Sequence, residues 1–135
     1  MNYSELIQLY FERSNALQSY WTLYVVIVGG LLAFSSLRKQ PAALTTAIVS
    51  ILFALFAYEN LSAIQTTTTH RFATLEAIKA SAGTDADVSR LRGSLEPTLQ
   101  PASHGSVQLT HLISDVLTIA GLWAMELRRR KMTPA

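Results

Sequence analysis

The sequence predicts an all-α integral membrane protein with three transmembrane helices preceded by an amphipathic N-terminal helix. Half of the 135 residues are hydrophobic and only 15% are charged, which is unusual for a globular domain of this size. The apolar residues gather into three blocks with the charged residues between them, as expected when lipid surrounds the side chains. At 1.5 Å per residue, each block approaches the thickness of a bilayer's hydrocarbon core.

Residues 1–19 are expected to form the amphipathic helix, since their apolar residues recur at helical spacing. Ser4 is the candidate N-cap, and no full capping box is expected because Ile7 stands where Glu or Gln would complete it. No Gly or Pro follows, so the helix either runs straight into the first span or lies on the membrane surface and turns near Ser19. The basic n-region of a secretory signal peptide is missing, which predicts that this segment is retained.

Residues 20–37 are the predicted first transmembrane helix, and aromatic residues at its start form an interfacial belt. A short turn leads to the second, residues 42–59, so the two form an antiparallel hairpin. Pro41 suits the first position of that second helix. Small residues give both helices smooth faces suited to close helix packing: Gly29, Ala33, Ala47, Ser50, Ala54 and Ala57.

Residues 60–105 are expected to be a mostly helical extracytoplasmic segment. Its composition favours a continuation of the second helix to Ala82, although the β-branched run Thr66–Thr69 opposes helix. Residues 83–85 then supply a stop and a cap for a short helix ending near Leu95. An extended connector is expected to follow, with Pro97, Pro101 and the triplet His104-Gly105-Ser106.

Residues 106–127 are the predicted third span, and it carries an aspartate. Asp115 is expected about 12 Å from the outer end of the helix, where an ionised carboxylate is costly unless protonated, hydrated or paired. The polar residues of this helix are three or four positions apart and therefore share one face. Together with the end of the second span they form a candidate polar stripe: Gln108, His111, Asp115, Thr118 and Glu59.

Basic residues flank the spans unequally, which predicts the orientation. Residues 60–106 hold four basic and four acidic residues, a balance of zero, whereas the first turn and the tail, residues 128–135, are basic. With three spans both basic clusters fall on one side, the cytoplasmic side by the positive-inside rule, and the N-terminus lies outside. A bacterial cytoplasmic membrane is the expected location. The clusters are assigned to topology and lipid headgroups: Arg38, Lys39, Arg128, Arg129, Arg130 and Lys131.

Composition and motifs argue against catalysis. The chain has no cysteine, no HExxH, no Gly-rich phosphate loop, and its histidines, His70, His104 and His111, lack paired-ligand spacing. We therefore expect no enzyme, metal or cofactor. No nucleic-acid partner is expected either, because the basic run directly follows a span. The expected partners are the lipid bilayer and either further copies of the chain or other membrane subunits.

Two functions remain open for the polar stripe. In the first, the protein is an oligomeric scaffold or accessory subunit of a membrane complex, and Asp115 fixes the helix register through hydrogen bonds. The alternative is a small proton- or cation-conducting oligomer whose pathway is lined by the stripe. A third hypothesis makes residues 60–105 a sensor that binds a ligand and moves the second span.

Overall fold

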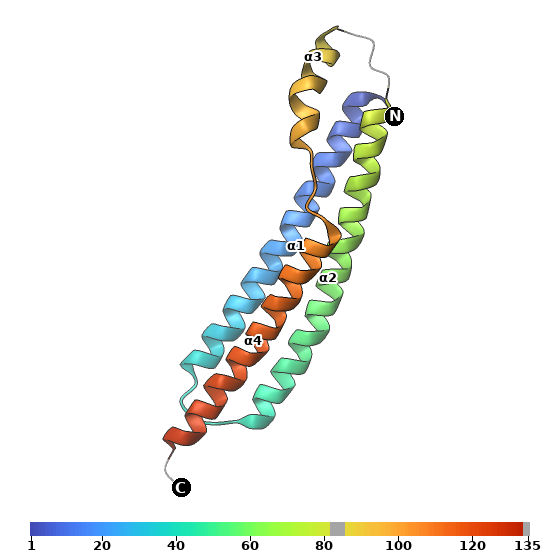
Figure 1. The fold of residues 1–135 in the computed structure, drawn as a ribbon. Helices are drawn as coiled ribbons and strands as arrows, with labels where there is room; N and C mark the ends of the chain where they lie inside the picture. Colours follow the sequence, from blue (N-terminus) through green and yellow to red (C-terminus); the bar gives the residue numbers. More distant parts are fainter. Residues whose placement is uncertain (82–85, 134–135) are drawn as a thin grey trace.

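The computed structural model describes residues 1–81 and 86–133. Within them it contains four α-helices, one short 3₁₀ helix and no strand. Figure 1 shows three long helices side by side, with the α1–α2 turn and the C-terminus at one end and the N-terminus and α3 at the other. The elements in order are α1 (Tyr3–Leu37), α2 (Ala43–Ala80), α3 (Ala86–Leu95), η1 (Glu96–Thr98) and α4 (His104–Met132).

Helices α1, α2 and α4 are each long and apolar enough to cross a membrane, which confirms the prediction of a multi-pass all-α membrane protein. With 35 and 38 residues, α1 and α2 are about 52 and 57 Å long and extend well beyond a hydrocarbon core of about 30 Å. Large apolar side chains face outward along the apolar parts of the bundle, as a lipid-facing surface requires. Among those 45% to 74% exposed are Val25, Phe34, Leu44, Ile51, Leu55, Leu112, Ile113, Val116 and Leu117.

Helix α1 begins with a capping box, contrary to the prediction. The side chain of Asn2 accepts a hydrogen bond from the backbone N–H of Glu5 (2.9 Å), and the Glu5 carboxylate accepts one from the Asn2 backbone (2.8 Å). Ser4 is therefore inside the first turn and not the N-cap. The helix then continues without a break to Leu37, so the first of the two predicted arrangements is confirmed.

Helix α2 begins two residues later than Pro41, the residue expected to open it. Ala42 is the N-cap and no side chain caps the helix. Inside α2 the threonine run causes no break, because Thr68 and Thr69 donate their hydroxyl hydrogens to carbonyls one turn earlier (2.8 and 3.0 Å). The predicted continuation of the second span is thus confirmed, to Ala80.

The extended connector before α4 is shorter than predicted. The predicted stop and cap at residues 83–85 lie outside the described residues, but the short helix α3 does end at Leu95. Pro97 then lies in η1 and not in an extended connector. Helix α4 begins at His104 with Ser103 as its N-cap and ends at Met132, past the predicted end at residue 127. The residues expected to form the end of the connector and the start of the basic tail are therefore helical.

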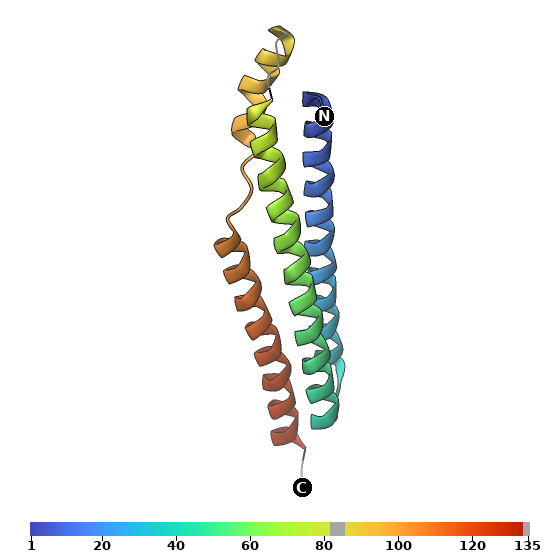
Figure 2. The ribbon, with the colours of Figure 1, turned by 90° about the vertical axis from the view of Figure 1, so that its right-hand side faces the viewer.

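Two apolar clusters hold the bundle together. One, in the halves of α1 and α2 nearer to α3, joins these two helices to the segment between α3 and α4, called the linker below, through Tyr10, Ile78 and Leu99. The other, in the apolar half, is centred on Tyr24, Phe53 and Ala57. Figure 2 shows α3 and the linker on the same side of the bundle as α4. All three long helices thus contribute to one continuous interior.

Candidate functional site

The inward face of α4 carries the buried residues of the predicted polar stripe. His111 and Thr118 are buried, and the side chain of Asp115 is only 16% exposed. Gln108 and Glu59, the other members of the predicted stripe, are exposed to the surroundings of the bundle. The structure therefore brings three of the five predicted residues to one interior surface. That surface faces α1 and α2 of the same chain.

His111 and Asp115 belong to what we call the mid-bundle network, made of Tyr24, Asn60, His111 and Asp115. The Asp115 carboxylate accepts a hydrogen bond from the Tyr24 hydroxyl (2.7 Å) and contacts His111 Nδ1 (2.9 Å). His111 Nε2 lies 3.1 Å from the side-chain oxygen of Asn60, whose amide group donates to the Tyr20 carbonyl (3.2 Å). One network thus connects all three long helices.

The partners in the mid-bundle network determine its hydrogens. Both ring nitrogens of His111 face oxygens, those of Asp115 and Asn60. Because the Asn60 amide is oriented by its bond to a carbonyl, its oxygen faces the imidazole, so Nε2 carries hydrogen. Every group is then satisfied when one further proton lies in the contact between His111 and Asp115. The network as a whole is neutral in that state, which suits an apolar surrounding.

The mid-bundle network lies near the end of the predicted second span that is closer to α3. Asn60 directly follows residues 42–59, the predicted second span, and it is hydrogen-bonded to His111. Asp115 is one helical turn beyond His111, about 6 Å along the axis. Measured from the predicted bounds of the second span, the carboxylate lies about half as deep as the predicted bounds of the third span imply.

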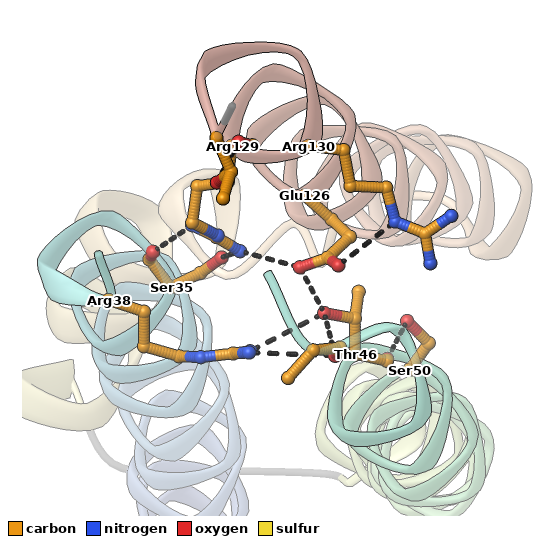
Figure 3. A network of polar contacts seen from close by, with 9 residues as sticks. Ser35, Arg38, Thr46, Ser50, Glu126, Arg129 and Arg130 are labelled. Carbon is orange, nitrogen blue, oxygen red and sulfur yellow. Dashed lines mark hydrogen bonds and ion pairs between the residues drawn. The ribbon is translucent and has the colours of Figure 1, made fainter. Parts of the chain in front are cut away.

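A second network lies at the opposite end of the spans, beside the α1–α2 turn (Figure 3). We call it the loop-side network; its members are Ser35, Arg38, Thr46, Glu126, Arg129 and Arg130. Glu126 at its centre is fully buried. Its carboxylate accepts from Arg129 (3.2 Å) and Arg130 (3.3 Å) and faces the Thr46 hydroxyl (3.3 Å). Burial of this acid is possible because two guanidinium groups compensate its charge.

The loop-side network also joins all three helices. Arg129 is 9% exposed and donates to both the carbonyl and the hydroxyl of Ser35, close to the end of α1. Arg38 reaches from the turn to the Thr46 hydroxyl (3.4 Å) and the Ala42 carbonyl (3.5 Å), both at the start of α2. Since Ala42 has no side-chain cap, these contacts and the chain turn define how α2 begins.

An apolar layer separates the two networks. Asn60 and Thr46 are 14 residues apart on α2, about 21 Å, and Phe53 lies midway between them, fully packed. Ile119 of α4 packs against the Phe53 cluster at this level. The hydroxyls of Ser50 and Thr118 near this layer donate to carbonyls of their own helices (2.8 and 2.7 Å). The described side chains therefore form no continuous polar path along the interior.

The small residues predicted as a packing face are divided by the structure. On α2, Ser50 and Ala57 are buried, Ala47 is half-buried and Ala54 is exposed, because the inward face runs through Thr46, Ser50, Phe53, Ala57 and Asn60. On α1, Gly29 and Ala33 face outward, and a methyl group added to Gly29 would meet no atom within 4 Å. Within the chain, these two residues leave α1 a smooth outer surface.

The halves of α1 and α2 that lie nearer to α3 contact α3 and the linker through two arginines. Arg71 lies over the ring of Tyr10 (5.0 Å), whose hydroxyl donates to the Leu99 carbonyl (2.7 Å). Arg92 pairs with Glu96 (2.9 Å) and donates to carbonyls at the end of α2, including those of Ile78 and Ser81. The structure thus ties the segment proposed as a sensor to both long helices.

Sequence reasoning missed three central residues. Asn60 follows the predicted second span, and only its heptad spacing from Thr46 and Phe53 could have placed it on the inner face. Glu126 fell in the last turn of the predicted third span and received no role, and Arg129 was assigned to topology and lipid headgroups, although their i,i+3 spacing allows an ion pair. Among the described residues no cluster of three or more His, Asp or Glu side chains could hold a metal ion.

No protein-family model matches this chain, and comparison with curated proteins and with solved structures finds none that matches. Its function must therefore be argued from the residues themselves.

Proposed function

We propose that this protein is a non-enzymatic structural subunit of a membrane, acting as an oligomeric scaffold or as an accessory subunit of a larger membrane complex. The observation that carries the proposal is the outward face of α1. Gly29 and Ala33, four positions apart, are both exposed, and Thr22 lies two turns before Gly29 on the same side and is exposed as well. Small residues at this spacing allow the backbone of another membrane helix to approach closely.

The internal networks support the same proposal. Asp115 and Glu126, the acids that lie inside the apolar parts of the helices, already have partners within the chain. Such paired groups orient helices relative to each other, each bond contributing about 0.6 kcal/mol on average in membranes. A bundle fixed in this way presents a defined outer surface to a partner. We further propose a bacterial cytoplasmic membrane, with the N-terminus outside and the first turn in the cytoplasm, from the distribution of basic residues.

Oligomeric state in mild detergent tests the proposal. Gly29→Leu or Ala54→Leu enlarges an exposed position without entering the bundle, so the monomer should fold and the assembly should be lost. Ala120→Leu is the matched control, since Ala120 is exposed on α4. Native mass spectrometry and chemical crosslinking of the full chain give the readout. A monomeric wild-type protein with no co-purifying membrane partner would contradict the proposal. Ser50→Leu is less useful because Ser50 packs inside the bundle.

Ion conduction is the alternative function, and the 2.9 Å contact between His111 Nδ1 and the Asp115 carboxylate, two groups that can exchange a proton, is the observation in its favour. The apolar layer at Phe53 and Ile119 argues against a path through a single bundle. Reconstituted vesicles separate the alternatives. Conduction requires pH-dependent flux that Asp115→Ala abolishes, whereas a scaffold gives flux equal to that of empty vesicles.

A further inference from the structure

A basic cleft of about 520 Å³ opens between the C-terminal ends of α1 and α4, next to the loop-side network. Its lining combines cationic and apolar side chains. The cations are Arg38, Lys39, Arg128 and Arg129, and the apolar residues include Met125 and Met132. Figure 3 shows Arg129 reaching from α4 to Ser35 near the end of α1, and Arg38 extending from that end toward Thr46 on α2.

The cleft has an excess of positive charge. Four cations line it, and Glu126, the acid that pairs with one of them, is shared between Arg129 and Arg130. Lys39 and Arg128 make no hydrogen bond or ion pair with any residue that the structure describes. Basic residues at the end of a helix balance its dipole, but that role does not require two unpaired cations from different helices to line one cleft.

Arg129 lines the cleft without adding a free cation to it. It is more than nine-tenths buried, and its guanidinium group already bonds Ser35 and Glu126. An acceptor bound in the cleft would therefore neutralise mainly the charges of Lys39 and Arg128.

The position of the cleft identifies the acceptor. It lies at the ends of the predicted first and third spans, residues 37 and 127, where phospholipid phosphates are located. The methionines provide apolar, adaptable surface beside the cations. We propose that this cleft binds the phosphodiester headgroup of an anionic membrane phospholipid, with the start of an acyl chain against Met125. Basic pockets between transmembrane helices bind such headgroups in other proteins. The proposal does not depend on the scaffold function.

Native mass spectrometry of the full chain in detergent, titrated with phosphatidylglycerol or phosphatidylcholine, tests the site. We expect one phosphatidylglycerol to bind in clear preference to phosphatidylcholine. Lys39→Gln and Arg128→Gln should each weaken it about fivefold, and the double variant about twenty-fivefold. Lys131→Gln is the matched control, because it removes the same charge at the same end of the molecule from a residue outside the lining. Lys39, Arg128 and Lys131 are all exposed, so these substitutions should leave the circular dichroism spectrum unchanged.

Inorganic phosphate distinguishes a lipid site from a site for a soluble anion. It should not displace the bound lipid, and Met125→Gln should weaken lipid binding while leaving any phosphate binding unaltered. Displacement of the lipid by phosphate would reassign the cleft to a soluble anion. Equal binding of phosphatidylcholine, or a loss for Lys131→Gln as large as that for Arg128→Gln, would overturn the proposal.

Discussion

The two networks accommodate a carboxylate inside the helix bundle in different ways. Both connect all three long helices, and both contain a carboxylate within an apolar bundle. The mid-bundle network places its carboxylate, Asp115, between the Tyr24 hydroxyl and the His111 imidazole, with no arginine or lysine among its members. The loop-side network stays charged, with Glu126 held between Arg129 and Arg130.

Depth explains the difference. The loop-side network lies at the ends of the helices, where long arginine side chains can keep part of their charge close to water; the side chain of Arg130 is 49% exposed. The mid-bundle network is a turn inside the spans and is built from short, rigid groups. The carboxylate paired with guanidinium groups therefore lies near the helix ends, and the carboxylate paired with an imidazole and a hydroxyl lies deeper in the bundle.

Replacing Glu126 should break the loop-side network and cause the largest loss of stability among the variants proposed below. Glu126→Leu leaves Arg129 buried without its carboxylate, and an unpaired buried charge is among the most destabilising changes. Thermal unfolding of the purified protein in detergent should show the greatest loss of stability among these variants. Adding Arg129→Met to Glu126→Leu should recover most of it, because an apolar pair of similar size replaces the ion pair. Failure of the double variant to recover stability would mean that the charge pair is not the cause.

Removing Asp115 should cost less, and the result should depend on the replacement. Asp115→Ala leaves both the Tyr24 hydroxyl and His111 Nδ1 without a partner, a cost of about 1–3 kcal/mol. Asp115→Asn should be close to neutral, because the amide can accept from Tyr24 and donate to an imidazole that carries hydrogen on Nε2. The free energy of unfolding in detergent measures both. If Asn destabilised as much as Ala, the network would require the ionised carboxylate.

A smaller effect is expected for Tyr24→Phe, which removes one hydrogen-bond donor and keeps the ring in the apolar cluster. The loss should be about 1 kcal/mol, in the range of single bonds between membrane helices. Tyr58→Phe is its control, as Tyr58 is 72% exposed. Equal unfolding free energies for the two variants would show that the Tyr24 hydroxyl contributes nothing.

The smallest effect is expected for Arg130→Gln, which sharpens the comparison within the loop-side network. This half-exposed arginine should contribute no more than about 1 kcal/mol, and its contribution should fall as salt screens the pair. Unfolding measured at low and high ionic strength checks both points. A salt-independent loss as large as that of Glu126→Leu would contradict the assignment of Arg129 as the principal partner.

Sequence reasoning identified Asp115 and His111 because polar residues within an apolar run are visible without a structure. It did not identify Glu126, because the predicted span ended at the next residue and the arginines after it resembled a solvated tail. Ala47 and Ala54 were grouped with Ser50 and Ala57, although the inward face runs through Thr46 and Phe53. When most faces of a helix are apolar, its own sequence does not show how the helix is rotated about its axis relative to its neighbours.

The sequence by itself determined the all-α class, the three spans, the hairpin and the unequal distribution of charge. These depend on sums over local stretches, since hydropathy and flanking charge set where a chain can cross a bilayer. Only the tertiary structure decided which polar groups meet. Asn60 with His111, and Glu126 with Thr46, are pairs 51 and 80 residues apart in the chain. Their contacts arise because three long helices pack at one fixed rotation, which no single helix specifies.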